Sequence, residues 1–408
     1  DYSHRTVKAT YVEFPLKNMA GSVVAWTTTP WTVTGNQFVA VDENLTYARV
    51  ENKHSDETYY VAEECVDNLV EKLSWDNYSV GNTLKGSELV GEEYNHPLDG
   101  MMKSLPKEEF MVEHADYVEA EKTGFVHSAP GYGHEDYERG EELGLSPYSP
   151  VESDGRFSEE LPAYSGLYVH DEGAEKVMND LSENGYLLAT EKYTHEYPEC
   201  PRCDTDVVFR ATEQWFFKAT EMKTGLQSAI DNTDWFPSDA RDERFRNTVE
   251  NAPDWNISRQ RYWGTPLPVW VCEECSSDNV VRSADELEER AKQDVEVEDM
   301  HRPNVDDVVV ECSECGGDAK RLQDVLDVWF DSSVASWGSL GVKPSDDPSP
   351  DQWPSNLIVE GHDQTRGWFL MQLYLGVALA DQAPYEDVLM HGFALLDSEP
   401  MSKSRGHV

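Results

Sequence analysis

The sequence predicts an α/β protein with a β-rich first half and an α/β second half. Short β-branched and aromatic runs, separated by Gly, Pro and Asn, fill residues 1–195. From about residue 196, apolar strands lead through polar loops into helices, which is the βα pattern of a parallel sheet. Paired cysteines in the second half are the third observation, because CxxC pairs indicate a metal-bearing module.

The elements of the first half are mostly strands. Patterning predicts strands at Val7–Phe14, Val23–Thr29, Tyr59–Val61 and Tyr117–Val118, and helices near Ala62–Leu73, Glu135–Leu143 and Glu172–Asn184. We therefore expect a β-rich domain with few helices.

In the second half, two apolar strands are each followed by polar residues. Leu357–Val359 leads into Glu360–Gln364 and a helix from about Arg366 to Ala380. A second strand, Asp387–Met390, leads into His391 and Gly392. Since ligands of parallel sheets bind at the carboxyl ends of the strands, these polar residues are candidates for a nucleotide-type site.

Charge is the most unusual property of the composition. The 408 residues, enough for two or three domains, include 33 basic and 79 acidic residues, a net charge of −46. With 39% apolar and 11% aromatic residues, the acids indicate a coat on folded domains, typical of a halophile's cytoplasmic protein. Nucleic-acid binding by bulk charge is disfavoured and would need local basic patches. No signal segment or bilayer-spanning run is present, so we expect no membrane partner.

The threonine-rich stretch from Trp26 to Thr32 is the first candidate site. Pro30 ends the preceding strand because proline donates no backbone hydrogen bond. The hydroxyls of Thr27, Thr28 and Thr29 therefore lie at a strand terminus, where they can line a polar pocket. Threonine is also a good strand residue, and the stretch alone does not exclude that simpler explanation.

A second candidate lies between residues 121 and 144. A strand carrying His127 leads into a Gly-rich turn, after which a helix opens with early acids that its dipole favours. Asp136 needs no function there, yet a carboxylate beside a Gly turn can hold an ammonium group. His127 alone is more often a strand histidine whose hydrogen bonds are satisfied in the core.

Six of the seven cysteines form three CxxC pairs. Two pairs flank a charged insertion and together supply the four thiolates of a tetrahedral zinc site, with unliganded thiols as the alternative: Cys272, Cys275, Cys312 and Cys315. Cys200 and Cys203 form half of a second site, whose partners we expect upstream of Asp1.

The last candidate is the segment Pro400–Gly406, in which Lys403 stands between two serines. An ammonium group and neighbouring hydroxyls on a mobile loop can contact a triphosphate and stabilise departing pyrophosphate. A short Lys/Ser loop is weak evidence by itself, but here it follows a βα nucleotide-type half.

Together these segments resemble class I aminoacyl-tRNA synthetases of the isoleucine type over nearly all of the chain. The resemblance rests on MSKS after HGFAL, VEGHDQTRGWF, DVLDVWFDSS, DWNISRQRYWG and FRATEQWF. The run TTTPWT indicates the isoleucine type, because the valine and leucine types usually have Arg where Thr29 stands. The resemblance implies a β-rich editing domain (1–195) inserted in a Rossmann-type catalytic domain (196–264 and 323–408), which also carries a zinc-bearing insertion (265–322). It also implies a fragment without the HIGH motif or the anticodon-binding domain.

The resemblance further implies roles for individual residues. In the editing domain, Asp136 holds the amino group of the misplaced amino acid, Thr27, Thr28 and Thr29 form the pocket wall, and His127 lies near its side-chain end. In the catalytic domain, Trp329 and Trp368 wall the isoleucine pocket, Glu360, Gly361, Asp363 and Gln364 contact the adenylate beside His391 and Gly392, and Lys403 contacts the triphosphate. Two departures from the family pattern are Pro400 in place of the first Lys of KMSKS, and Tyr132 where bacterial relatives often have His.

The expected function is ATP-dependent activation of isoleucine with Mg2+, transfer to tRNA(Ile), and hydrolysis of misformed Val-tRNA(Ile) by a cytoplasmic monomer. A hydrophobic pocket discriminates one missing methylene by only about 1–3 kcal/mol, a limit for which this enzyme type is the standard example, so a second, hydrolytic site is needed. No Ser-His-Asp nucleophile is apparent, which favours attack by water. We expect the fragment to show no ATP–pyrophosphate exchange. The alternatives are a valine-type enzyme that hydrolyses Thr-tRNA and a non-catalytic RNA-binding module built on the zinc knuckles.

Overall fold

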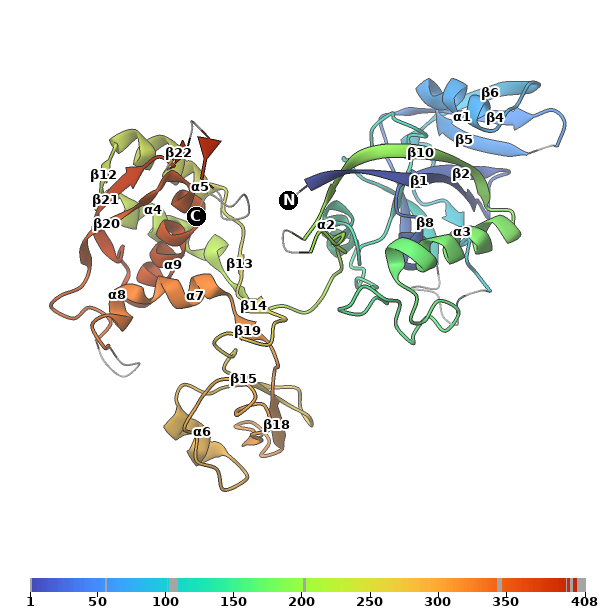
Figure 1. Ribbon diagram of the computed structural model, residues 1–408. Coiled ribbons are helices and arrows are strands. Elements are labelled where there is room, and N and C mark those ends of the chain that lie inside the picture. Colours follow the sequence, from blue (N-terminus) through green and yellow to red (C-terminus); the bar gives the residue numbers. More distant parts are fainter. Residues whose placement is uncertain are drawn as a thin grey trace. The chain divides into compact units, whose positions relative to one another are not determined.

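The computed structural model describes residues 2–55, 57–100, 102, 109–200, 203–342, 347–393, 395–396 and 399–401. The chain divides into two compact units, Asp1–Thr212 and Glu213–Val408 (Figure 1). Strand β10 (Leu187–Pro198) runs through residue 195 and belongs wholly to the first unit.

Two sheets form the frame of the first unit. The larger has the order β10-β1-β2-β5-β4-β6, and the smaller has the order β7-β8-β3-β9. Their strands are β1 (Tyr2–Pro15), β2 (Ser22–Thr27), β3 (Phe38–Val41), β4 (Thr46–Asn52), β5 (Thr58–Ala62), β6 (Tyr78–Lys85), β7 (Glu93–Tyr94), β8 (Phe110–His114) and β9 (Val126–Ser128). β1 and β10 pair antiparallel over most of their length, and Figure 1 shows them as two long ribbons side by side.

The helices of the first unit follow the predicted positions closely. They are α1 (Val66–Lys72), α2 (His134–Glu142) and α3 (Ala174–Glu183), the last preceded by a wider turn at Val169–Gly173. The inward residues of α1 and α3 join the aromatic and β-branched strand residues in one large core. The β-rich character of this half is therefore confirmed.

Two strand predictions in the first half were wrong in detail. β2 ends at Thr27 rather than Thr29, because Pro30 is the first residue of a 3-10 helix, Pro30–Gly35, and Thr29 precedes it as the cap. Proline's fixed φ suits that first helical position. Tyr117 lies in a turn after β8 rather than in a strand.

A short parallel sheet, in the order β12-β21-β20, organises the second unit. Its strands β12 (Asp234–Phe236), β20 (Ser355–Gly361) and β21 (Tyr385–His391) pack against α4 (Lys223–Asp231), α5 (Arg246–Glu250) and α9 (Trp368–Ala380). The apolar α9 is buried over most of its length, as expected for a helix that is hydrophobic on every side. The predicted strand–loop–helix unit is thus confirmed.

Shorter elements connect this sheet to a separate small core. β11 (Phe216–Phe217) pairs with β13 (Trp255–Asn256), and β14 (Ser258–Arg259) pairs with β19 (Val325–Leu326), which is followed by α7 (Val328–Ser333) and α8 (Ala335–Gly338). Between them lies a four-stranded antiparallel sheet with α6 (Ala284–Arg290); its strands are β15 (Val269–Cys272), β16 (Asp278–Val280), β17 (Val310–Glu311) and β18 (Asp318–Arg321). Trp270 and Leu287 are buried in its core.

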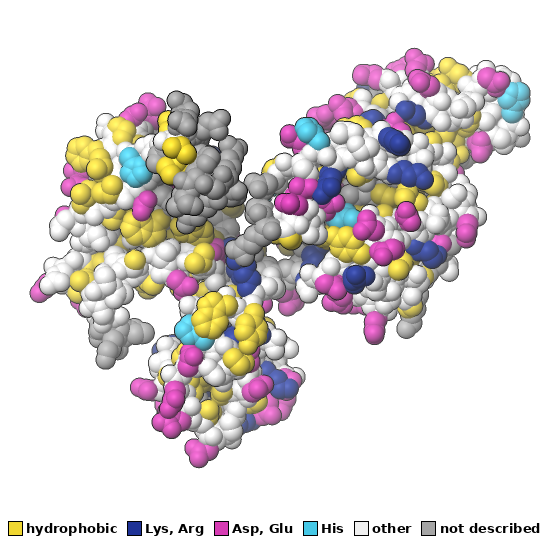
Figure 2. Space-filling model, viewed as in Figure 1, with side chains coloured by type: hydrophobic (Ala, Val, Ile, Leu, Met, Phe, Trp, Pro, Cys, Tyr) yellow, Lys and Arg dark blue, Asp and Glu magenta, His cyan; other side chains and the backbone are white. Residues whose placement is uncertain are grey.

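Acidic side chains are scattered over the visible face of each unit, and Lys and Arg gather mainly on the first (Figure 2). Within the described ranges, no helix combines the length and apolar character needed to cross a membrane.

Candidate functional site

The threonines that follow β2 form a hydrogen-bonded cluster. The Thr29 backbone N–H donates to Thr27 Oγ1 at 3.1 Å, and the Thr27 and Thr29 hydroxyl oxygens lie 3.3 Å apart. One 3-10 turn later, Thr32 Oγ1 donates to the Thr29 carbonyl at 2.8 Å and lies 3.4 Å from Thr29 Oγ1. The cluster arises because Pro30 starts the turn that brings Thr32 back over Thr29.

His127 closes this cluster from the neighbouring strand β9. Its Nε2 lies 2.9 Å from Thr32 Oγ1, and its Nδ1 lies 3.0 Å from Asn36 Nδ2. Burial lowers the pKa of His127 from 6.5 to about 4, so the ring is neutral at physiological pH. With both nitrogens occupied, His127 is suited to holding the threonines in place rather than to accepting a proton from water.

Asp136 is the third residue of α2 and is held on the segment that follows His127. Its Oδ2 accepts the Ala129 N–H at 2.9 Å, and its Oδ1 accepts the Tyr117 hydroxyl at 3.0 Å. Burial raises the pKa of Asp136 above 3.8, and these two hydrogen bonds oppose the rise. The Asp136 carboxylate is half-buried, and no ion pair joins it to a cationic side chain among the described residues, so it could accept an ammonium group.

Thr28 and Thr29 also line a cavity of about 530 Å³ in the first unit. Basic, acidic and aromatic side chains complete its wall, among them Arg5, Lys8, Trp31, His170, Glu175, His195 and Tyr197. Thus Thr27 is joined directly to Thr29, Thr29 is joined to His127 through Thr32, and Thr28 lines the cavity. In the described residues no hydrogen bond links Asp136 to the threonines.

In the second unit, the predicted polar residues lie at the carboxyl edge of the parallel sheet. Gly361 and His391 are register partners at the ends of β20 and β21. Asp363 accepts a hydrogen bond from Gln364 Nε2 at 2.8 Å, and Gln364 Oε1 accepts the Trp368 backbone N–H at 2.9 Å. A Cβ at position 361 would approach Asp363 Oδ1 to 2.6 Å, so a larger residue there would require the Asp363 carboxylate to shift. Glu360 and Gly392 are exposed beside these residues.

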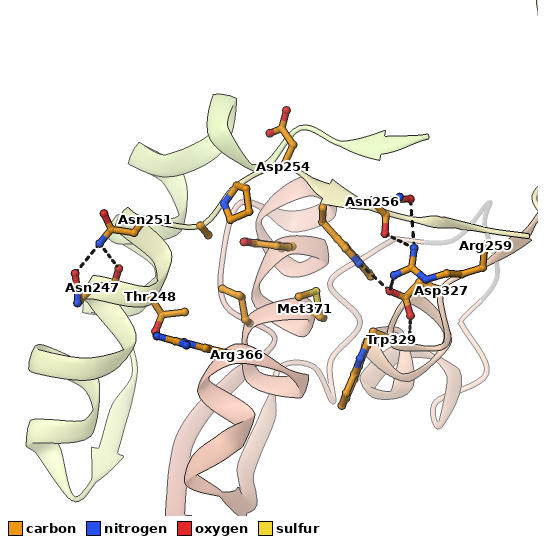
Figure 3. Close-up of a pocket in the computed structure, with 15 residues that line it drawn as sticks. Asn247, Thr248, Asn251, Asp254, Asn256, Arg259, Asp327, Trp329, Arg366 and Met371 are labelled. Atoms are coloured by element: carbon orange, nitrogen blue, oxygen red, sulfur yellow. Dashed lines mark hydrogen bonds and ion pairs between the residues drawn. The ribbon is translucent and has the colours of Figure 1, made fainter. Parts of the chain in front are cut away.

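The two predicted tryptophans lie where α7 meets α9. Trp368 Nε1 donates to the Ser332 carbonyl at 2.9 Å, and the Trp329 ring lies next to Gly367. Trp329 also lines a cavity of about 590 Å³ together with Asn256, Arg259, Asp327 and residues of α5 and α9 (Figure 3). Trp368 is not among the residues that line it.

Asp327 anchors this wall, although sequence reasoning did not select it. Its side chain pairs with Arg259, accepts Trp255 Nε1 at 3.2 Å and accepts the Trp329 N–H at 3.1 Å (Figure 3). Asp327 is 5% exposed, so its charge is compensated inside the wall. Its place in the motif DVLDVWFDSS was the only available signal.

Four cysteines form a compact group in the small antiparallel module: Cys272, Cys275, Cys312 and Cys315. Their sulfurs all lie within 4.8 Å of one another, with 3.5 Å between Cys272 and Cys315 and 3.7 Å between Cys275 and Cys312. A metal with bonds of about 2.3 Å to four sulfurs in a tetrahedron separates them by about 3.8 Å. The group could therefore hold a metal ion, and its spacing is consistent with zinc.

The other predicted site residues are two cysteines and one lysine. Cys203 is exposed and Cys200 is half-buried, and within the described residues neither belongs to a group of three or more potential ligands. Lys403 lies outside the described residues.

The residues that contact His127 and Asp136, directly or through Asn36, were not selected from the sequence. Thr32, Asn36 and Tyr94 are buried, and Tyr117 contacts Asp136 from a turn. Thr32 lies within the run TTTPWT and so had a local signal. Tyr94 and Tyr117 had none, because they reach the site only through the pairing of β7, β8, β3 and β9.

Comparisons with known proteins show the family to which the chain belongs. Residues 23–408 match the family model described as tRNA synthetases class I (I, L, M and V). An isoleucine--tRNA ligase of Haloquadratum walsbyi is 46% identical over 100% of this chain and 40% of the relative. One of Methanothermobacter marburgensis is 45% identical over 100% of this chain and 39% of the relative.

Among solved structures, that titled "The crystal structure of GlLeuRS-CP1" is 15% identical, with a TM-score of 0.31, over 45% of this chain and 87% of its own. The chain spans about 40% of the length of the curated relatives it matches. Because the family model covers nearly the whole chain, the chain belongs to the class I tRNA synthetases of the I, L, M and V group.

Proposed function

We propose that the chain is part of an isoleucine--tRNA ligase that activates isoleucine with ATP and Mg2+, transfers it to tRNA(Ile) and hydrolyses misformed Val-tRNA(Ile). The observation that carries this proposal is the 44–46% identity, along the chain, to archaeal proteins named isoleucine--tRNA ligase. Thr29 and the hydroxyl cluster around it support the isoleucine assignment over a valine-type enzyme.

In this proposal the first unit contains the editing site. The Asp136 carboxylate binds the ammonium group of the valyl ester, and the Thr27–Thr29 wall admits valine by its methyl groups and excludes isoleucine. Threonine hydroxyls and backbone carbonyls orient the ester and a water molecule for direct attack. His127 is neutral and is hydrogen-bonded through both ring nitrogens, which supports a role in orienting the threonines. No side chain needs to form a covalent intermediate.

The second unit contains part of the synthetic site. Trp329, which lines the cavity, and Trp368, which lies beside it on α9, wall the isoleucine side chain. The carboxyl edge at Glu360, Gly361, Asp363 and Gln364, with His391 and Gly392, contacts the adenylate. Asp327 and Arg259 fix the wall that carries Trp329. Lys403 is assigned the triphosphate contact on the sequence motif alone.

The metal in this proposal is zinc, held by the four cysteines of residues 265–322. A closed tetrahedral site of four thiolates supplies folding energy and leaves no open position for chemistry. The short turns that bring each CxxC pair together support this: Ser276 N–H donates to the Cys272 carbonyl at 3.0 Å, and Gly316 N–H donates to the Cys312 carbonyl at 2.9 Å. Cys200 and Cys203 are proposed as half of a second site.

The remaining assignments follow the resemblance of the sequence motifs to this family. We take 1–195 as the editing domain and 196–264 with 323–408 as the catalytic domain, in a monomeric, cytoplasmic enzyme whose partners are tRNA(Ile), isoleucine and ATP. Basic side chains on the first unit support local RNA contact despite the net charge of −46 (Figure 2).

Deacylation of Val-tRNA(Ile) by the purified chain in molar KCl tests the editing proposal. Asp136→Ala should lower kcat/KM on the order of 10- to 100-fold, as expected for losing a charged hydrogen bond. Glu135→Ala, which removes the exposed neighbouring acid on the same helix, is the matched control and should leave the rate unchanged. Equal rates for wild type and Asp136→Ala, or faster hydrolysis of Thr-tRNA than of Val-tRNA, would contradict the proposal.

A further inference from the structure

We propose that Tyr94 is a positioning residue of the threonine site. Through Asn36 it fixes which ring nitrogen of His127 carries the proton, and His127 in turn holds Thr32 against Thr29. The inference rests on the proposed hydrolytic function of the same site. It assigns a role to a residue whose hydroxyl bonds to Asn36 and acts on the threonines only through other side chains.

The first half of this chain of hydrogen bonds runs from β7 to β9. The Tyr94 hydroxyl donates to Asn36 Oδ1 at 2.6 Å, and Asn36 Nδ2 donates to the Phe38 carbonyl at 2.8 Å. Asn36 Nδ2 also lies 3.0 Å from His127 Nδ1. Since an amide nitrogen can only donate, His127 Nδ1 must be the acceptor and the ring proton must reside on Nε2.

The second half runs from His127 to the threonine wall. Thr32 Oγ1 uses its one proton on the Thr29 carbonyl at 2.8 Å, so it can only accept from His127 Nε2–H at 2.9 Å. In this series each residue therefore donates to the next one, from Tyr94 through Asn36, His127 and Thr32 to the Thr29 carbonyl. With the proton on Nδ1 instead, Nε2 would compete with the Thr29 carbonyl for the Thr32 proton.

Because these four side chains are buried, loss of the Tyr94 hydroxyl should affect the hydrogen bonds at Asn36, His127 and Thr32. Tyr94 and Asn36 are 0% exposed, and His127 and Thr32 are 7% and 8% exposed. Phe14 packs against both rings, with centroids 5.5 Å from Tyr94 and 6.4 Å from His127. Without the Tyr94 hydroxyl, Asn36 Oδ1 loses this donor, and the amide is oriented by the contacts of its Nδ2 to the Phe38 and Ser128 carbonyls and to His127 Nδ1. An inverted amide would face His127 Nδ1 with its oxygen and favour the other tautomer.

Tyr94→Phe tests the inference, with Tyr47→Phe as the matched control. Tyr47 is also 0% exposed and donates a hydrogen bond to the Gly124 carbonyl at 2.7 Å, and among the described residues no hydrogen bond joins its hydroxyl to Asn36 or His127. Long-range proton–nitrogen correlation spectra of histidine-labelled protein report the tautomer of His127, and a His127→Gln variant identifies its signals. Val-tRNA(Ile) deacylation gives kcat and KM for the same proteins.

We expect wild type and Tyr47→Phe to show the Nε2–H tautomer alone, and Tyr94→Phe to show a population of the Nδ1–H form. Its kcat should fall about 5- to 10-fold, the equivalent of one hydrogen bond, with KM unchanged. An unchanged tautomer in Tyr94→Phe, or a kcat equal to that of Tyr47→Phe, would overturn the inference. The spectra do not depend on hydrolysis, so an inactive wild type would refute the proposed function while the tautomer comparison still tests the link from Tyr94 to His127.

Discussion

Lowering the pH should destabilise the first unit through His127, and the structure gives the size of the effect. The buried ring keeps its pKa at about 4, whereas in the unfolded chain it is near 6.5. Between these two pH values His127 is protonated in the unfolded chain but stays neutral in the folded protein. The contribution of His127 to the free energy of unfolding is therefore fully present above pH 6.5 and is lost as the pH falls. The full difference corresponds to about 3 kcal/mol, of which about 2 kcal/mol is lost between roughly pH 7 and pH 5.

Urea unfolding of wild type and His127→Gln at pH 7 and pH 5, in molar KCl, measures this contribution. Wild type should lose about 2 kcal/mol more unfolding free energy than the variant over that interval. His96, whose pKa is lowered to about 3 mainly by burial and also by the neighbouring His127, is present in both proteins, so only the part of its shift that comes from His127 differs between them. His4→Gln, on β1 away from the threonine cluster, is the control and should behave as wild type. The same pH dependence in wild type and His127→Gln would refute the neutral, buried His127 on which the site geometry depends.

Two further predictions concern the hydroxyl cluster and the cysteine module. Thr29→Val keeps the side-chain volume but removes the hydroxyl, so hydrolysis of Val-tRNA(Ile) should fall several-fold while the free energy of unfolding changes by less than about 1 kcal/mol; an unchanged rate would show that this hydroxyl has no part in the reaction. Chelation, or Cys312→Ser, should release one metal ion per chain and expose Trp270, which is 1% exposed in the fold, as seen by tryptophan fluorescence. Ester hydrolysis should survive both treatments, and its loss would contradict the assignment of the editing site to the first unit.

Much of the second unit was predictable because its signals are local. A parallel strand ends in polar residues a few positions before its helix starts, so Gly361, Asp363 and His391 could be placed at one sheet edge from sequence order alone. The four clustered cysteines were predictable for the same reason, since each CxxC pair is held within a single turn.

The inner part of the threonine site was not predictable, because its contacts are long-range. Thr32 meets His127 across 95 residues and Tyr94 meets Asn36 across 58, both through strand pairing that no local pattern encodes. Tyr117, predicted in a strand, lies in a turn, from which its hydroxyl donates to Asp136. The ion pair in the wall of the second-unit cavity could not be predicted for the same reason, since Asp327 and Arg259 are 68 residues apart in the sequence.

The relative rates at which the chain hydrolyses Val-tRNA(Ile), Thr-tRNA(Ile) and Ile-tRNA(Ile) test the central proposal most directly. A threonine-walled site closed by His127 should hydrolyse the valyl ester at least about tenfold faster than the isoleucyl ester, since one excluded methylene is worth about 1–3 kcal/mol. Equal rates for the valyl and isoleucyl esters, or a preference for the threonyl ester, would contradict the assignment of this site to isoleucine-type editing.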